Sequence, residues 1–525
     1  MTAHISIICF AIFAMLPAKE ICAEDAKQNP QRPNILFLFS DDHALRTISA
    51  YGGGINSTPN IDRIASEGAI FTRSFCTNSI CCPSRASILT GKHSHLNGVT
   101  GNGSKWDGKQ MVFPRLLRKA GYQTALIGKW HLKGNPGDEF DFWKILSGAG
   151  GQGHYYNPDF LTGRGAEQIT GYSSDIIANE AMKWLATQRV PKKPFMLMCQ
   201  FKAPHVHRMP ALRYLRLYEG TQIPEPPTLF DNYRGRQPYA SKAWMQIKGI
   251  PNHVLNIHPA AGKVDTSRRE GKFMARMTQS QRDAWHAVFD TRNAEYRRLK
   301  AEGKLEGKDK TRYQYQRYIK DYLRCVAAVD ENIGRLLLWL DQMNLTDNTI
   351  VIYSSDQGYY TGEHGWAEKR WMYEESLRMP LVMRWPGRIK PGTRIDGMVQ
   401  NIDYAPTFLD IAGATVPAAM QGKSLLPLLT GKTPDLWRQS IYYHYYDHGA
   451  HNVPRHEGVR TGRYKLIHYY TDGQWELFDL EKDPNELTSK YNDPAFTDVQ
   501  SRLNLELATL RKQYKLPPLP NFERK

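Results

Sequence analysis

Asn34-Ile35-Leu36-Phe37-Leu38-Phe39 is the stretch that decides the fold of this 525-residue chain, and Ser40-Asp41-Asp42 follows it. The run has no polar alternation, so a strand formed here is buried on both faces, as in a parallel sheet. Two adjacent carboxylates at the end of such a strand repel each other. They are compatible either with a solvated turn or with a hard cation such as Ca²⁺ or Mg²⁺.

Three more apolar runs are expected to form buried strands, and each is followed by polar residues. Helical patterns lie between them at 113–120, 174–188 and 311–343. The alternation predicts an α/β domain with a large, mainly parallel sheet flanked by helices. The runs and the residues they deliver are Gln123–Ile127 with Lys129 and His131, Phe195–Phe201 with His205, and Thr349–Tyr353 with Asp356 and Gln357.

The polar ends of these four strands predict one active site. Ligands of open α/β sheets bind beyond the carboxyl ends of the strands. A single polar strand end is ordinary, but four of them at equivalent ends converge on one crevice. We therefore expect Asp41, the pair Lys129 and His131, His205, and Asp356 to meet there.

Cys81-Cys82-Pro83-Ser84-Arg85, running on to Leu89-Thr90-Gly91, predicts a helix that begins next to Cys81. Proline suits a first helical turn because its missing N–H would have no partner there. Gly91 can end the helix in the left-handed conformation. Cys81 would then lie at a helix N-terminus, which favours an anion, with Arg85 one turn further on.

This stretch resembles the signature of the formylglycine-dependent sulfatases, because it matches seven positions within eleven. The resemblance implies an alkaline phosphatase-like fold and oxidation of Cys81 to formylglycine (3-oxoalanine), whose hydrate is the nucleophile. It also implies a partner, a formylglycine-generating or sulfatase-maturing enzyme. Nearly all of the mature chain resembles the family.

The same resemblance assigns the other site residues. Asp41, Asp42, Asp356 and Gln357 match the family's ligands for one Ca²⁺, together with the formylglycine from Cys81; many members have Asn in place of Gln357. Oxygen donors suit this hard ion. Arg85 and the matching lysines are expected to stabilise the sulfate's charge, and a histidine to protonate the leaving oxygen. The matching lysines are Lys129 and Lys369. We assign protonation of the leaving oxygen to His205 and an orienting role to His131, although the two roles could be exchanged.

The C-terminal part is expected to form a smaller antiparallel α+β subdomain, as in sulfatases. Residues 464–470 and 475–480 read as strands joined at Asp472-Gly473, and 501–513 as a helix. The family's corresponding region often contacts the sugar. The candidate contacts, each of which could equally belong to a polar surface loop, are His444, Asp447, His448, His451, His456 and Arg460.

The chain divides into a signal peptide (1–23), a catalytic domain (24–432) with an insertion of loops and short helices at about 208–310, and the C-terminal subdomain (433–525). The apolar run at 5–17 is too short to span a bilayer, and no later segment looks transmembrane. This pattern predicts a secreted or periplasmic protein. Seven cysteines, two of them in the signal, allow one or two disulfides at most.

The formal net charge of +17 favours an anionic partner, and no nucleic-acid-binding signature is present. Gly362–Trp366 and 451–456 look like carbohydrate sulfatases of the N-acetylglucosamine-6-sulfatase kind; iduronate-2-sulfatases and algal polysaccharide sulfatases are rivals. Two other classes stay open. A phosphatase or phosphodiesterase of the alkaline phosphatase superfamily should use Ser or Thr where this chain has Cys81, and a non-catalytic glycan-binding relative should keep Cys81 as a thiol.

Overall fold

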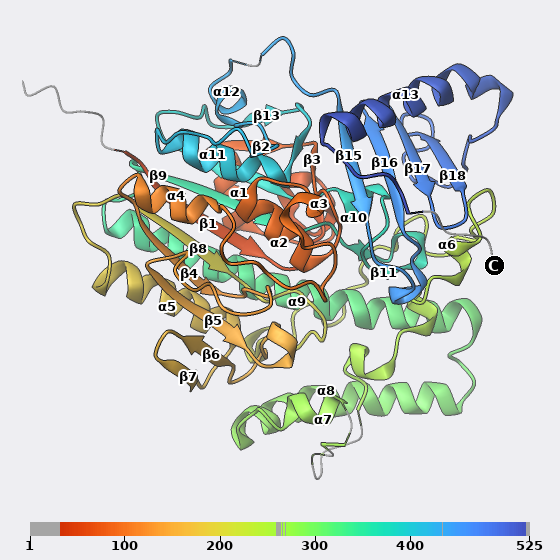
Figure 1. Ribbon diagram of the computed structural model, residues 1–525. Coiled ribbons are helices and arrows are strands. Elements are labelled where there is room, and N and C mark those ends of the chain that lie inside the picture. The colour runs from red at the N-terminus through yellow and green to blue at the C-terminus, as the bar shows by residue number, and fades with distance from the viewer. Residues whose placement is uncertain (1–31, 259–263, 265, 268, 433, 521–525) are drawn as a thin grey trace, which may run out of the picture. The chain divides into compact units, whose positions relative to one another are not determined.

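The largest element of the structure, a computed structural model that describes residues 32–258, 264, 266–267, 269–432 and 434–520, is a ten-stranded sheet (Figure 1). Its four central strands are parallel and almost wholly buried. The fold class predicted from the sequence is confirmed. In spatial order these strands are β9 (Thr349–Ser355), β1 (Asn34–Ser40), β8 (Phe195–Gln200) and β4 (Gln123–Gly128).

Six further strands extend the sheet on both sides, in the order β13-β2-β12 beyond β9 and β5-β6-β7 beyond β4. β12 pairs antiparallel with β9, so the sheet is mixed. Residues 69–75 form two short strands, β2 and β3 (Ser74–Phe75), and β3 lies outside the large sheet. The bounds are β2 (Ala69–Phe71), β5 (Phe142–Ser147), β6 (Asp159–Thr162), β7 (Gly165–Gln168), β12 (Leu381–Arg384) and β13 (Thr393–Ile395).

Alternate residues of β1 enter two hydrophobic clusters, one on each face of the sheet. Ile35 and Phe37 join the cluster to which α2, α4 and α11 contribute, whereas Leu36 and Leu38 join that of α1, α5 and α9. Burial on both faces explains the unbroken apolar run. The helices are α1 (Pro59–Ser66), α2 (Cys81–Thr90), α4 (Phe113–Lys119), α5 (Ser173–Thr187), α9 (Gly307–Gln342) and α11 (Tyr404–Ile411).

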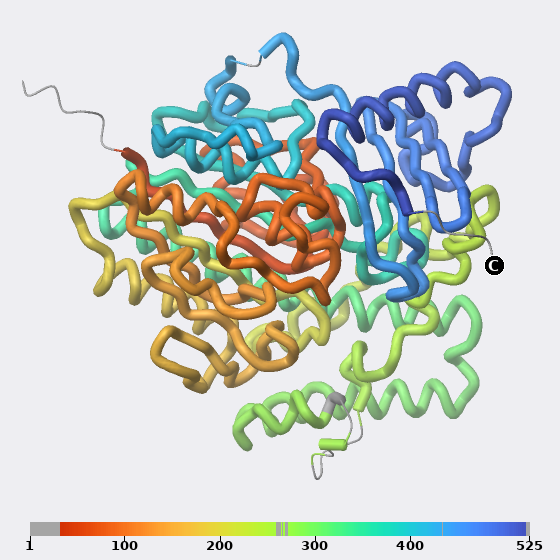
Figure 2. Tube along the Cα trace, in the orientation of Figure 1, coloured from red at the N-terminus to blue at the C-terminus, as the bar shows by residue number. Residues whose placement is uncertain are grey.

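The insertion at 208–310 differs from the prediction of loops and short helices, because it contains α8 (Gln279–Ala301), a helix of 23 residues. Thr278 and Gln281 form a capping box at its start, and Trp285 and Phe289 are buried. Figure 2 shows the chain turning back from α8 into α9. The shorter helices of the insertion are α6 (Tyr239–Lys242) and α7 (Arg269–Met274).

A separate antiparallel sheet of four strands lies near the C-terminus, as predicted. One of its faces packs on the helix α13 (Thr497–Gln513) through Tyr442 and Leu466, and the other contributes Tyr443 and Ile467 to the main core. The domain boundaries remain a prediction, and the signal peptide lies outside the described residues. The strands are β15 (Ser440–Tyr445), β16 (His456–Thr461), β17 (Tyr464–Tyr469) and β18 (Gln474–Asp479).

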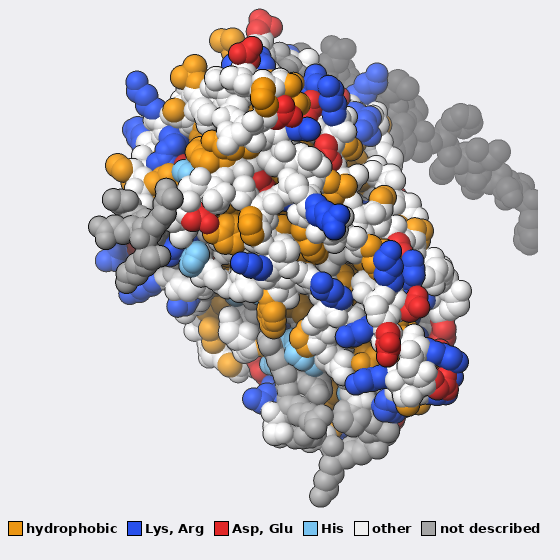
Figure 3. All heavy atoms as spheres, turned by 90° about the vertical axis from the view of Figure 1, so that its right-hand side faces the viewer, with side chains coloured by type: hydrophobic (Ala, Val, Ile, Leu, Met, Phe, Trp, Pro, Cys, Tyr) orange, Lys and Arg blue, Asp and Glu red, His pale blue; other side chains and the backbone are white. Residues whose placement is uncertain are grey.

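The positive charge is not concentrated on the face shown in Figure 3, where Lys and Arg side chains are scattered with Asp and Glu among them. No helix in the described part of the chain combines the length and apolarity needed to cross a bilayer. The five described cysteines are buried and free, so they form no disulfide with one another.

Candidate active site

The ends of β1 and β9 place three carboxylates together. Ser40 pairs with Ser355 in the parallel register, so the next residues, Asp41 and Asp356, leave the sheet side by side. Asp42 adopts a positive φ of 63°, and its backbone N–H donates to Asp356 Oδ1 at 3.1 Å. One oxygen from each of the three carboxylates lies within 4.8 Å of the others, and all three residues are fully buried.

Cys81 begins α2, as the sequence predicted, and it faces this cluster. Its Sγ lies 3.5 Å from Asp41 Oδ1. Gly91 ends the helix in the left-handed conformation with φ 64°. Burial, ahead of the surrounding charges, raises the pKa of the Cys81 thiol well above its usual value. The unmodified residue is therefore a neutral thiol rather than a reactive thiolate.

Arg85 lies one turn into α2 and connects the strand ends. Its Nη2 lies 3.5 Å from Asp41 Oδ2 and 3.1 Å from Asp356 Oδ2. Nη1 donates to the backbone oxygen of Lys129 at 3.1 Å and to Gln200 Oε1 at 2.5 Å. The buried guanidinium holds the ends of β1, β4, β8 and β9 in one arrangement.

Lys129 and His131 follow β4 and share one partner, Gln152. The Lys129 ammonium pairs with Asp41 and donates to Gln152 Oε1. The amide nitrogen of Gln152 lies 2.8 Å from His131 Nε2. Burial lowers the pKa of both Lys129 and His131 well below their usual values, and the neighbouring cations lower that of His131 further.

His205 lies on the loop after β8 and faces the cluster from another side. Its Nε2 is 3.7 Å from Asp42 Oδ2, and its Nδ1 is 2.5 Å from the backbone oxygen of Val206. A carbonyl accepts only, so Nδ1 carries the proton and Nε2 is bare. Burial and then the nearby lysines lower the pKa of His205 well below its usual value, so its imidazole is neutral.

Lys369 and Gln357 both contact Asp42. Lys369 Nζ donates to Asp42 Oδ2 at 2.8 Å, and Gln357 Nε2 donates to Oδ1 at 2.5 Å. Burial raises the pKa of Asp42 to about 6, although Lys369 opposes the shift. Among the described residues, Gln357 Oε1 is buried without a hydrogen-bond partner.

These residues fit a hard divalent cation. Asp41, Asp42 and Asp356 offer only oxygen donors, and the unsatisfied amide oxygen of Gln357 is a further one. Oxygen ligands in this number suit Ca²⁺. A cation would also relieve the repulsion between three buried carboxylates.

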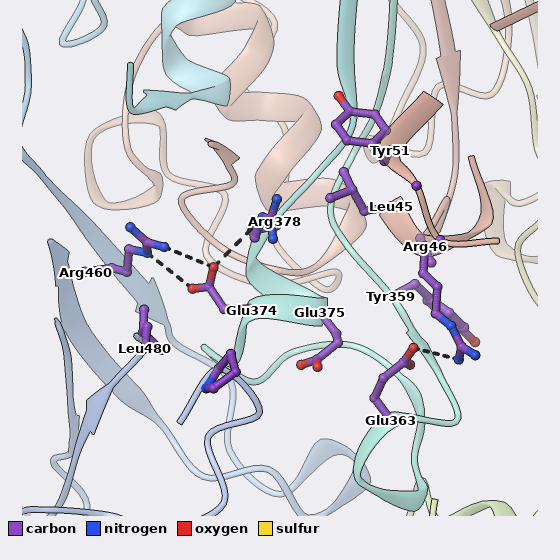
Figure 4. Close-up of a pocket in the computed structure, with 14 residues that line it drawn as sticks. Leu45, Arg46, Tyr51, Tyr359, Glu363, Glu374, Glu375, Arg378, Arg460 and Leu480 are labelled. Atoms are coloured by element: carbon purple, nitrogen blue, oxygen red, sulfur yellow. Dashed lines mark hydrogen bonds and ion pairs between the residues drawn. The ribbon is translucent and has the colours of Figure 1, made fainter. Parts of the chain in front are cut away.

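Three of the predicted saccharide contacts are engaged by other side chains of the protein, and a fourth, His448, is exposed. His444 is hydrogen-bonded to Tyr442 and Tyr470. His456 is fully buried among aromatic rings such as that of Trp371. Arg460 pairs with Glu374 at 3.3 Å and lines a separate cavity of about 430 Å³ (Figure 4).

Asp447 and His451 are close enough to the candidate site to feel its charges. Arg370, the neighbour of Lys369, is among the charges that act on both residues. The His451 ring lies 5.3 Å from that of Trp244, which is 65% exposed, and the backbone N–H of Trp244 donates to the backbone oxygen of His451 at 3.0 Å. The exposed tryptophan thus lies next to a neutral histidine, because burial lowers the pKa of His451 to about 4.

Sequence reasoning missed three buried or half-buried polar residues of the site. Gln152 lies in the glycine-rich loop at 148–153, which carries no strand or helix signal. Arg370 directly follows Lys369 in the chain, and both side chains lie near the carboxylate of Glu368. Lys202 follows the predicted strand Phe195–Phe201 directly, so the strand-end rule that found His205 could have found it.

Two family models match the chain. A model described as Sulfatase matches residues 33–414, and one described as N-sulphoglucosamine sulphohydrolase, C-terminal, matches residues 362–513. An N-acetylglucosamine-6-O-sulfatase of Bacteroides thetaiotaomicron is 46% identical over 501 residues, which cover 94% of this chain and 89% of that protein. The similarity therefore includes both the ten-stranded sheet and the small sheet.

Solved structures agree with this picture. One relative, determined in complex with its substrate D-glucosamine-2-N,6-O-disulfate, has a TM-score of 0.90 and 46% identity, covering 92% of this chain and 98% of that chain. A phosphonate monoester hydrolase of Agrobacterium radiobacter has a TM-score of 0.66 at 22% identity, covering 92% of this chain and 96% of that one. The second likeness concerns the fold alone.

Proposed function

The chain belongs to the sulfatase family and is a sulfuric ester hydrolase acting on a sulfated carbohydrate, and we propose that it removes the 6-O-sulfate of an N-acetylated or N-sulfated glucosamine residue. The observation that carries this proposal is the 46% identity to the N-acetylglucosamine-6-O-sulfatase over nearly the full length. No observation favours a phosphatase, because the chain belongs to the sulfatase family and has Cys81 where a phosphatase should have a Ser or Thr nucleophile.

The nucleophile in this proposal comes from Cys81. Oxidation by a formylglycine-generating or sulfatase-maturing enzyme would turn its side chain into an aldehyde, whose hydrate supplies the attacking hydroxyl. Its place at the start of α2 supports this role, because the positive end of the helix favours an anion in front of it. The hydroxyl and the bound sulfate would then meet beside Asp41, 3.5 Å from Sγ.

Three cations of the chain would hold the sulfate. Arg85, Lys129 and Lys369 are each at most 4% exposed, and each is already fixed by a carboxylate. Charges held in place before the reaction stabilise the growing negative charge without reorganisation. A bound calcium ion, with Asp41, Asp42, Asp356 and Gln357 as ligands, would supply further positive charge on the sulfate oxygens.

The leaving alcohol needs a proton, for which we propose His205. Its bare Nε2 faces the site, and the neutral form has to gain a proton before it can act as an acid. A bound sulfate ester brings a negative charge close to the ring, and such a charge raises a histidine pKa. His131, held by Gln152, would orient Lys129.

The saccharide itself would rest on Asp447, His451 and the exposed Trp244, next to Arg370. His444, His456 and Arg460 are not part of this proposal, because each is already engaged by other side chains. We further propose a secreted or periplasmic location, as the apolar leader sequence suggests.

A desulfation panel tests the proposal. The purified protein, with Cys81 conversion checked by peptide mass, is incubated with glucosamine derivatives sulfated at O6, at O3 or on nitrogen, and with 2-O-sulfated uronic acids. We expect release from O6 alone. Release from another position only would overturn the substrate assignment, and an unconverted Cys81 with no release from any compound would favour the non-catalytic glycan-binding reading.

A further inference from the structure

Lys202 is a buried lysine whose charge has no carboxylate partner. It is 3% exposed and lies two residues after β8, between Gln200, which accepts from Arg85, and His205. Its backbone oxygen accepts from the N–H of His205 at 3.1 Å. Lys202 therefore belongs to the same strand-end loop as the proposed acid.

The ammonium of Lys202 contacts an aromatic ring. Nζ lies 5.1 Å from the centroid of Tyr155, whose hydroxyl donates to the backbone oxygen of His205 at 2.6 Å. No hydrogen bond or ion pair within the described residues engages Nζ. Burying an ammonium without a counterion is costly, so such a group is expected to meet an anion in its working state.

The charges around Lys202 are those of the active site. Asp42 and Cys81 are among the groups that raise its pKa, against the larger effect of burial, which lowers it to about 8. In turn, Lys202 is one of the cations that lower the pKa of Lys129, His131 and His205. Its positive charge thus acts on the same residues that are proposed to hold the sulfate.

The other two lysines of the site differ from Lys202 in one respect. Lys129 pairs with Asp41, and Lys369 pairs with Asp42. Both have their charge balanced within the protein, whereas Lys202 does not. We propose that Lys202 is a substrate-contacting residue whose ammonium binds a sulfate group of the saccharide. This inference rests on the proposed function, because the substrate would supply the missing counterion.

Lys202→Met tests this role in the full-length, converted enzyme. We expect kcat/KM on glucosamine-6-sulfate to fall at least tenfold and the inhibition constant of inorganic sulfate to rise. The Tm should stay equal or increase, because an unpaired buried charge is replaced by an apolar chain of similar length. Lys202→Arg should restore sulfate inhibition, since it keeps the charge.

Lys144 provides a matched control. It is 6% exposed, and its Nζ lies 5.6 Å from the Phe160 ring, but it pairs with Glu167 at 2.5 Å and Glu180 at 2.9 Å. These partners lie on β7 and α5. Lys144→Met should therefore lower the Tm and leave kcat/KM within twofold of the parent enzyme.

The outcomes separate the possibilities. Equal losses on glucosamine-6-sulfate and glucosamine-2-N,6-O-disulfate support contact with the 6-O-sulfate, and a loss confined to the disulfate supports contact with the N-sulfate. Unchanged kcat/KM and sulfate inhibition in Lys202→Met would overturn the proposal, and so would a lowered Tm with unchanged sulfate inhibition. If the parent enzyme cleaves neither saccharide, the proposed function fails, but thermal shifts with inorganic sulfate still decide the role of Lys202.

Discussion

The carboxylate of Asp42 accepts a hydrogen bond of 2.8 Å from the ammonium of Lys369, although 327 positions separate the two residues in the chain. Both side chains are buried, so neither charge is balanced by water. Removing one partner of a buried ion pair leaves the other uncompensated, which costs more than the pair contributes as a whole. The stability of the site that follows β1 therefore depends on this contact.

Lys369→Met should lower the free energy of unfolding by about 3–5 kcal/mol in calcium-free buffer. Asp42 would respond by taking up a proton, since burial already raises its pKa to about 6. The loss should therefore shrink as the pH falls from 7 to 5. Denaturant unfolding at both pH values checks this, and a variant as stable as the parent protein at pH 7 would contradict it.

Calcium should raise the Tm of the parent protein. A ligand that binds only the folded state at a hundred times its Kd adds about 2.7 kcal/mol. Asp356→Asn should abolish the response to added Ca²⁺ and to EGTA, because it removes one carboxylate of the buried cluster.

Asp330→Asn is the control for that experiment. Asp330 is equally a buried carboxylate, at 3% exposed, but it accepts from the backbone N–H groups of Asn60 and Ile61 at the start of α1. This variant should lose stability and keep the calcium response. A calcium shift retained in Asp356→Asn would count against the metal site.

Cys81→Ser should stop turnover, because a serine alcohol can accept sulfate but cannot release it by collapse of an aldehyde hydrate. Cys82 serves as the control: its Sγ donates to the backbone oxygen of His131 at 2.7 Å, and a serine hydroxyl can make the same bond. Cys82→Ser should keep at least a tenth of the activity. Steady-state sulfate release checks both variants, and undiminished hydrolysis by Cys81→Ser would refute the formylglycine mechanism.

The sequence predicted the central strands because burial on both faces leaves an unbroken apolar run. It did not predict β12, which is only four residues long and ends in Arg384, a fully buried arginine that pairs with Glu67. Such a segment has no period that separates it from a loop. The sequence did not predict β5, β6 and β7 either, because these strands are short and partly exposed and so leave no clear apolar pattern.

The site was predictable where residues follow a buried strand, because topology alone brings strand ends together. Asp41, Asp356 and His205 are of this kind. The surroundings of the polar residues in the small sheet could not be predicted, because they depend on which face of that sheet packs on the main core. His456 and Arg460 point to one face of β16, where the first meets aromatic rings and the second meets Glu374.

Trp244→Ala should raise KM for a sulfated saccharide by three- to tenfold and leave KM for a small aryl sulfate unchanged. The ring is 65% exposed beside His451, so it offers an apolar surface without supporting the core. The Tm should stay the same. Leu505, which is 70% exposed on α13, provides a surface control, and Leu505→Ala should change neither KM value. Equal KM effects on both substrates in Trp244→Ala would argue against a saccharide contact.

His364 should make the stability fall at alkaline pH. Its ring is fully buried, with Nε2 3.5 Å from Glu375 Oε2 and Nδ1 3.2 Å from Asp231 Oδ2. Burial alone would lower its pKa, and Arg236 acts in the same direction, but Glu375 and Asp231 raise it from 6.5 to about 9. A histidine with a raised pKa stabilises the folded state fully below the unfolded pKa and loses this contribution as the pH passes the folded one.

The parent protein should therefore lose about 3 kcal/mol between pH 6.5 and 9.5, and His364→Asn should show a flatter profile over this range. Glu486, whose pKa burial raises to about 7, loses its contribution mainly between pH 4.5 and 7, so the comparison is best made from pH 7 upward. Denaturant unfolding of both proteins at half-unit steps measures the difference. Parallel profiles from pH 7 to 9.5 would mean that His364 is not protonated in the folded protein.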